Sequence, residues 1–420
     1  MTTQKEWIDR AAKVLPAGGF GNFDPNIVIA RGAGSHVWDE DGNRYIDYLI
    51  GSGPMLVGHC HPEVMEVVDE QLKLGTTFFA TNAHGIELAE EICFAVACAD
   101  QVRFVSTGGE ADMYAMRLAR AHTGRDKILK FEGGYHGMSA EALMSLAPTR
   151  MENFPQAVPD SAGIPESVRD NMIIAPFNDA EMAAQLMTEH ADEIAAVIVE
   201  PLQRLIPPAE GFLEALRTET KKHGIVLIFD EVVTGFRMAY GGAQEYYGVV
   251  PDLCTMGKII GGGFPLAAIA GTEEIMAHFD KAKVGVEGFT FQVGTLSGNP
   301  VASAAGLKTM EILKRDGAYE SLRNCGKHIM GLLDKHLSAA GHDFQIIGDP
   351  VLFDVFFSDR AIIDYRGVLR SDAAKLQRFN VLMRKKGIFK SDSKFYPSLP
   401  LSDEDLEQTD AAIAYASRAL

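Results

Sequence analysis

Residues 225–231 read IVLIFDE, five apolar side chains followed at once by two carboxylates. A run that is apolar on both faces is typical of a buried parallel strand in a sheet that helices cover on both sides. Open α/β sheets bind their ligands at the carboxyl ends of such strands, and Asp230 stands at that end. The segment therefore predicts the fold class and places one acidic side chain at the functional site.

Short apolar runs alternate with helical patterns on both sides of this segment. Strand candidates lie at residues 102–105, 127–131, 195–199 and 266–270, and helical patterns at 62–74, 84–96, 110–122 and 211–222. The alternation predicts an α/β fold with a mostly parallel sheet. We expect a large domain at residues 51–300. A smaller α+β domain would combine residues 1–50, which include a hairpin at 35–50, with residues 301–420.

Residues 151–168 predict a loop, because they lack periodicity and are rich in Pro, Ala and Ser. Long loops of α/β enzymes often lie near the site. A surface excursion without a role is an equally good interpretation of this segment.

The composition is that of a globular protein with an acidic surface. The 420 residues carry a formal net charge of −18, which repels nucleic acid and anionic membranes. No stretch approaches the roughly 20 apolar residues of a membrane span, and the N-terminal segment has no apolar signal core. Five cysteines without a C-x-x-C pair argue against a disulfide framework or a zinc site. We therefore expect a cytoplasmic protein.

Lys258 stands between a short apolar segment and the glycines 261–263, which let the backbone approach a bound group closely. A lysine in such a place can form a Schiff base, and Asp230 can hold a pyridinium nitrogen protonated. Taken alone, Lys258 could also be a surface lysine beside a turn. The Gly257-Lys258 pair does not form a nucleotide P-loop, because Ile259 replaces the required Ser or Thr.

Further motifs follow the predicted strands. Residues 106–110, STGGE, combine a Gly-rich turn with a helix start, which suits either a phosphate or a capped turn. Tyr135 could stack on a cofactor ring or belong to the core. Glu200 could hydrogen-bond in a cofactor region or lie in a loop. His59 and His61 do not obviously share one face, and no ligand cluster completes them, so we predict no metal site.

These motifs occur together and in a fixed order, and in this the chain resembles the class III aminotransferases, which are pyridoxal-phosphate (PLP) enzymes of fold type I. The resemblance rests on residues 41–47 (DGNRYID), 58–62 (GHCHP), 131–137 (FEGGYHG), 229–237 (FDEVVTGFR) and 294–300 (GTLSGNP). It covers nearly the whole chain. Within the class, the chain is most similar to the glutamate-1-semialdehyde aminomutase branch.

The resemblance implies roles for individual residues. Lys258 would carry the cofactor as a Schiff base and shuttle the α-proton of the substrate, and Asp230 would pair with the pyridine nitrogen. Tyr135 and Val232 would pack on the two ring faces. The other implied cofactor-binding residues are Gly108 and Gly109 at the phosphate, His136 and Glu200 in the cofactor region, and Thr295 at the phosphate of the neighbouring subunit. The working unit would therefore be a homodimer.

The chain departs from the family pattern at several positions. Gly109 stands where the family usually has a hydroxyl residue. Residues 20–24 read FGNFD, whereas the aminomutases carry a substrate-binding Ser and Arg there, and Ser52 stands where they usually have Trp. Arg204 could bind a substrate carboxylate or be an exposed loop residue. Leu205 replaces the Glu that other class III enzymes have at this place.

The leading interpretation is a PLP aminotransferase that moves an amino group from a small amine, β-amino acid or ω-amino acid to pyruvate or 2-oxoglutarate. One alternative is an intramolecular glutamate-1-semialdehyde aminomutase. The other is a non-catalytic PLP-binding or scaffold protein, against which the presence of Lys258 and Asp230 argues. Ser52, Arg204, Phe20 and Phe23 are the side chains expected to shape the substrate pocket.

Overall fold

The computed structural model describes residues 2–420, which group into two compact units. The larger unit comprises residues 66–316 and 360–370. The smaller unit comprises the residues up to Met65 together with 317–359 and 371–420. The sequence alone places these limits at residues 50 and 300, and it does not indicate that residues 360–370 join the larger unit.

The larger unit is built on a seven-stranded sheet with the order β4-β10-β9-β8-β7-β5-β6. The strands are β4 (Gln101–Val105), β5 (Lys127–Phe131), β6 (Met172–Ala175), β7 (Ile194–Val199), β8 (Val226–Asp230), β9 (Leu253–Met256) and β10 (Ala267–Gly271). Within this sheet only β10 is antiparallel to its neighbours. The predicted α/β fold with a mostly parallel sheet is therefore confirmed.

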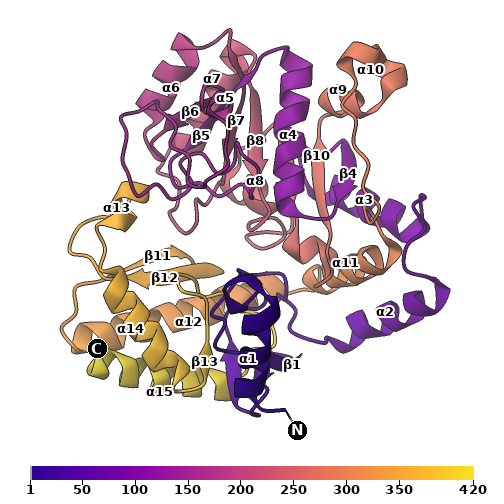
Figure 1. The fold of residues 1–420 in the computed structure, drawn as a ribbon. Coiled ribbons are helices and arrows are strands. Elements are labelled where there is room, and N and C mark those ends of the chain that lie inside the picture. The colour runs from indigo at the N-terminus through magenta and orange to yellow at the C-terminus, as the bar shows by residue number, and fades with distance from the viewer. Residues whose placement is uncertain (1) are drawn as a thin grey trace. The chain divides into compact units, whose positions relative to one another are not determined.

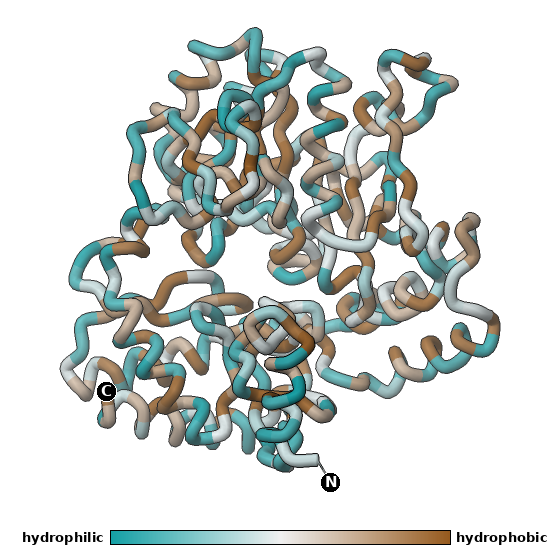
Figure 2. Tube along the Cα trace, viewed as in Figure 1, coloured by the Kyte–Doolittle hydropathy of each residue, from teal (hydrophilic) through white to brown (hydrophobic). Residues whose placement is uncertain are grey.

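Helices connect these strands and cover the sheet (Figure 1). The helices of this unit are α3 (Ala83–Ala95), α4 (Gly108–Thr123), α5 (Glu166–Arg169), α6 (Ala180–Glu189), α7 (Phe212–His223), α8 (Gly242–Tyr247), α9 (Glu273–Met276), α10 (Lys281–Gly288), α11 (Pro300–Leu313) and α13 (Tyr365–Leu369). Helix α4 packs on β4, β10, β9, β8 and β7. Every residue of β7 and β8 is buried, and hydrophobic segments concentrate along the strands in Figure 2. Burial of both faces explains the unbroken apolar runs.

The smaller unit contains a four-stranded sheet, a separate two-stranded sheet and four long helices. The first sheet has the order β1 (Ile29–Ala33), β2 (His36–Asp39), β3 (Arg44–Asp47), β13 (Ile388–Phe389), and the second pairs β11 (Gln345–Asp349) with β12 (Leu352–Phe356). The helices are α1 (Gln4–Val14), α12 (Ala318–Ala339), α14 (Ala373–Arg384) and α15 (Asp403–Ala419), while α2 (Pro62–Leu74) contains the boundary between the units. The antiparallel pair β2–β3 confirms the predicted hairpin.

Two strands of the seven-stranded sheet, β6 and β9, were not predicted. Each has only four residues, all buried, and so short a run does not reveal its period. Residues 151–168 form the expected loop up to Glu166, where α5 begins. Among residues 2–420, no helix combines the length and the apolar character needed to cross a lipid bilayer.

Candidate active site

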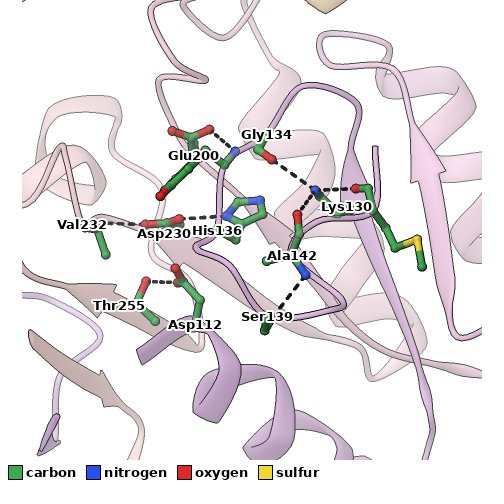
Figure 3. Close-up of polar contacts among 12 residues, drawn as sticks. Asp112, Lys130, Gly134, His136, Ser139, Ala142, Glu200, Asp230, Val232 and Thr255 are labelled. Atoms are coloured by element: carbon green, nitrogen blue, oxygen red, sulfur yellow. Dashed lines mark hydrogen bonds and ion pairs between the residues drawn. The ribbon is translucent and has the colours of Figure 1, made fainter. Parts of the chain in front are cut away.

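The carboxyl ends of adjacent parallel strands bring most of the predicted residues together. Asp230 ends β8, Glu200 directly follows β7, and Tyr135 and His136 follow β5 after a short turn. Because β8, β7 and β5 are neighbours in the sheet, these segments meet at one edge (Figure 3). The glycine-rich turn after β4 reaches the same region, since Gly108 lies against Val232.

Asp230 is a buried carboxylate that two donors hold. Its Oδ1 accepts a hydrogen bond from the Val232 N–H at 3.0 Å, and its Oδ2 lies 2.8 Å from Nδ1 of His136. Because a carboxylate only accepts, Nδ1 carries the imidazole proton. His136 is 1% exposed, and its Nε2 has no hydrogen-bond partner within residues 2–420. A buried polar atom without a partner is typical of a site that a ligand completes.

Glu200 and Arg204 both lie close to Tyr135. Oε2 of Glu200 accepts a hydrogen bond from the Tyr135 N–H at 2.8 Å, which fixes the backbone of this loop. The guanidinium carbon of Arg204 lies 5.4 Å from the centre of the Tyr135 ring. Burial raises the pKa of the Tyr135 hydroxyl, and the charge of Arg204 opposes that rise. Arg204 therefore places an exposed positive charge next to an aromatic side chain of the site.

A glycine-lined turn opens helix α4. Gly108 and Gly109 are its first two residues, and N–H groups at this position have no partner inside the helix. A Cβ at Gly108 would lie 2.8 Å from Cγ1 of Val232, and one at Gly109 would lie 3.2 Å from Cα of Gly137. Glycine thus lets two backbone segments and Val232 approach closely. Unpaired N–H groups at a helix start are suited to binding a phosphate.

Lys258 lies on a strained turn directly after β9. It begins the 3-10 turn Lys258–Gly261 with a φ of +50°, a left-handed conformation that is unfavourable for a residue with a side chain. Thr255 in β9 is the register partner of Asp230 in β8, so Lys258 follows three residues after the neighbour of Asp230. Backbone strain of this kind is often found at functional residues.

The remaining predicted residues lie elsewhere. Thr295 is exposed on a loop of the larger unit. Ser52 belongs to the smaller unit, where it is exposed with a φ of +64°. Phe20 is exposed, and the ring of Phe23 packs against Phe389 of the same unit at 5.0 Å between centroids.

Sequence reasoning missed two buried polar groups at the site. Lys130 in β5 donates to the carbonyls of Gly134, Ala142 and Met144 at 3.1, 2.9 and 2.7 Å (Figure 3). The sequence does not indicate a role for Lys130, because it stands inside an apolar run that predicts only a strand.

Asp112 in α4 is the second residue that was missed. It stands one turn before the buried residues Ala115 and Met116, and its Oδ1 accepts from the Thr255 hydroxyl at 2.6 Å. A carboxylate on the buried stripe of a helix was the signal that could have revealed it.

Asp112, His136 and Asp230 present side-chain atoms within 4.8 Å of one another. This spacing by itself could hold a metal ion, but His136 and Thr255 already bind carboxylate oxygens of Asp230 and Asp112. Burial and the neighbouring charge of Asp230 raise the pKa of Asp112 well above its ordinary range. We therefore do not assign the cluster to a metal.

Comparison with known proteins identifies the family. The chain matches the family Aminotransferase class-III over residues 21–410. It is 40% identical to a glutamate-1-semialdehyde 2,1-aminomutase of Natranaerobius thermophilus, over 96% of this chain and 93% of that protein. An omega-transaminase from Sphaerobacter thermophilus has a similar structure, with a TM-score of 0.93 and 35% identity over 99% of this chain and 97% of that chain. The protein belongs to the class III aminotransferases.

The cofactor of this family is PLP, and the residues at the site fit it. A similar transaminase structure holds bound PLP, with a TM-score of 0.90 and 30% identity over 100% of this chain and 99% of that chain. PLP requires an amine for its aldehyde, an acid for its ring nitrogen and donors for its phosphate. Lys258, Asp230 and the start of α4 are groups of these three kinds. The protein is a PLP-dependent enzyme.

Proposed function

We propose that the protein is an aminotransferase that moves an amino group from a small amine, a β-amino acid or an ω-amino acid to a keto acid such as pyruvate or 2-oxoglutarate. The observation that carries this proposal is the FGNFD sequence at residues 20–24, in place of the substrate-binding Ser and Arg of the aminomutases. The similarity to an omega-transaminase supports it. Bound PLP supplies the electron sink that makes the α-proton of an amine acidic.

The proposed catalytic residues are Lys258 and Asp230. The Lys258 amine binds the cofactor and, once released, moves the proton at the α-carbon of the substrate. Asp230 keeps the ring nitrogen protonated, because a buried carboxylate stabilises the positive charge of a pyridinium. Asp230 ends β8 and Lys258 follows the adjacent strand β9, so one sheet holds both residues in place.

Six further residues of the same subunit contribute to the proposed cofactor site. Tyr135 and Val232 pack on the ring faces, and the N–H groups of Gly108 and Gly109 bind the phosphate. His136 and Glu200 position these groups, since each makes a 2.8 Å hydrogen bond, to Asp230 and to the Tyr135 backbone respectively.

Arg204 is the proposed contact for the carboxylate of an amino-acid substrate. Its guanidinium is exposed and lies beside Tyr135, which we place on the cofactor ring. The planar fork of arginine binds a carboxylate through two parallel hydrogen bonds. Ser52 of the smaller unit is the second proposed substrate residue.

We propose a homodimer in which Thr295 reaches the phosphate site of the neighbouring subunit. Phe291, Val293 and Leu296 around it are exposed, and a cavity of about 830 Å³ is lined in part by Phe79 and Val293. Exposed apolar side chains that gather in this way mark an interaction surface. Light scattering should give the mass of a dimer, and a monomeric active enzyme would contradict the assignment of Thr295.

The cytoplasm is the proposed compartment. All five cysteines are free thiols, which is typical of a reducing environment. The net charge of −18 supports small-molecule substrates over nucleic acid as partners.

The absorbance of enzyme-bound PLP tests the proposed reaction. Single amines added without an acceptor should bleach the visible band for one class of donor, and pyruvate or 2-oxoglutarate should then restore it. The folded variant Lys258→Ala should show neither change. Full activity in that variant would overturn the catalytic assignment.

A second candidate is the intramolecular aminomutase, which the 40% identity to a protein of that name favours. That enzyme would isomerise glutamate semialdehyde without any acceptor. Isomerisation of this compound, together with no bleaching by any simple amine, would select it over the aminotransferase.

A further inference from the structure

Asp230 has a second carboxyl group for a neighbour. Asp112 of α4 is 1% exposed, and its side-chain oxygen lies within 4.8 Å of the ligand atoms of Asp230 and His136. Both carboxyl groups are buried, and a proton on either one would let it donate to the other. Two buried carboxyl groups at this separation do not both ionise at neutral pH.

The surrounding donors decide which group keeps the proton. Asp230 accepts from the Val232 N–H and from Nδ1 of His136, and both bonds favour its ionised form. For Asp112 the structure gives one outside donor, the Thr255 hydroxyl, which binds Oδ1. The proton is therefore placed on Asp112, on the oxygen that Thr255 does not bind.

The charged groups around Asp112 favour the same assignment. Burial is the largest cause that raises its pKa, the charge of Asp230 adds to it, and Glu200 at the end of β7 adds further. The Thr255 hydrogen bond lowers the pKa but does not compensate. His136, the remaining titratable group of the cluster, directs its Nδ1 proton to Asp230 and not to Asp112.

We propose that Asp112 is a positioning residue, a neutral carboxylic acid that donates its proton to Asp230 and thereby keeps Asp230 ionised toward the ring nitrogen of PLP. The inference rests on the proposed role of Asp230. An ionised carboxylate accepts about four hydrogen bonds. Val232, His136 and Asp112 fill three of these places, and one is left for the cofactor. Because the hydrogen bond from Asp112 stabilises the negative charge of Asp230, the proton between Asp230 and the ring nitrogen stays on the nitrogen.

Three variants separate this inference from the proposed function. Asp112→Asn keeps a neutral donor of the same size, Asp112→Leu removes the donor, and Asp230→Asn removes the charge. Each holoenzyme is examined for the dissociation constant of PLP, for the pH dependence of its visible absorbance, and for kcat. Infrared difference spectra of wild type against Asp112→Asn report the carbonyl band of a protonated carboxyl group.

We expect Asp112→Asn to stay within about twofold of wild type in PLP affinity and kcat, because the side chain was neutral already. Asp112→Leu should lower kcat by about tenfold and shift the absorbance titration, since a donor to a charged group is lost. The protonated-carboxyl band should be present in wild type and absent from Asp112→Asn. If Asp112→Leu does not fold, the infrared comparison decides alone.

Two results would overturn the inference. One is a loss of PLP affinity in Asp112→Asn as large as in Asp230→Asn, which would mean that Asp112 is charged. The other is a wild-type spectrum without the protonated-carboxyl band. Full activity of Asp230→Asn would instead overturn the proposed role of Asp230, whatever the Asp112 variants show.

Discussion

Nδ1 of His136 lies 2.8 Å from Oδ2 of Asp230, so the segment after β5 supports the carboxylate that ends β8. We expect His136→Phe, which fills the space without donating, to lower kcat about 10- to 100-fold, because a hydrogen bond to a charged group contributes about 1.5–3 kcal/mol. Steady-state kinetics at saturating PLP measure the change. His190→Phe, at the half-exposed end of α6, is the control and should leave kcat unchanged.

Lys130 should make stability depend on pH. Burial lowers the pKa of Lys130 to about 7, against about 10.4 in an unfolded chain. Between these values the unfolded state binds more protons, so the free energy of unfolding rises as pH increases through this range. The three carbonyl acceptors stabilise the ammonium form and so oppose the lowering of the Lys130 pKa in the folded state. They therefore raise the pH at which stability begins to increase.

The variant Lys130→Met should lose this pH dependence and about 3 kcal/mol of stability, because buried carbonyls lose their donor. Urea unfolding at several pH values between about 6 and 9 measures both effects. The exposed residue Lys385 supplies the matched control, Lys385→Met. An unchanged slope in Lys130→Met would show that Lys130 does not titrate in this range.

Gly108 and Gly124 stand at the two ends of α4. We expect Gly108 to affect PLP binding and Gly124 to affect only the stability of the helix. A Cβ at Gly108 would meet Val232 at 2.8 Å, so Gly108→Ala should weaken PLP binding by about tenfold or more. Gly124 ends α4 with a φ of +68° and open space around it. Gly124→Ala should cost about 1 kcal/mol of stability and leave PLP affinity intact. Equal effects on PLP affinity would argue against a phosphate site at Gly108.

Arg366 should stabilise the loop that precedes Tyr135. It donates to both carboxylate oxygens of the buried Glu132, at 2.8 and 3.0 Å, and to the carbonyl of Glu152 at 2.8 Å. Arg366→Met would leave the Glu132 charge unpaired and should destabilise the protein by roughly 3 kcal/mol. Arg366→Lys keeps the charge without the fork and should cost less. Urea unfolding of both variants tests whether Arg366→Met lowers the free energy of unfolding more than Arg366→Lys.

Arg204 should discriminate between donors. For Arg204→Gln we expect KM to rise about tenfold or more for amino acids and to change little for amines that lack a carboxylate. Initial rates with one donor of each kind give the ratio. A similar rise for both donors would mean that Arg204 acts through Tyr135 and not by binding the carboxylate.

The positions of β5, β7 and β8 could be predicted, because buried parallel strands show as apolar runs and end at polar groups. Asp230 and Glu200 were found in this way. The strand before Lys258, β9, could not be predicted. Tyr135 and the glycines at 108–109 were candidates from the residues alone, but a core aromatic and an ordinary turn remained open. The family motifs favoured a cofactor site at both places and supported His136.

The partners of Asp230 could not be predicted, because they depend on contacts between distant segments. Thr255 meets Asp112 across 143 residues, and His136 meets Asp230 across 94. Arg366 is more distant still, since it joins Glu132 from 234 residues away. Which distant segments meet depends on the order of the strands in the sheet. The sequence leaves this order open, because β6 and β9 are not recognised from it.

Gly108 and Asp112 stand on one rigid helix, and the rise of an α-helix separates them by about 6 Å along its axis. The proposed phosphate contact and the proposed support for the ring nitrogen therefore move as a single body. A substitution that tilts α4 to strengthen phosphate binding would also change the support of Asp230 and hence the protonation of the ring nitrogen. In the proposed site, the affinity for PLP and the reactivity of its ring therefore change together when α4 moves.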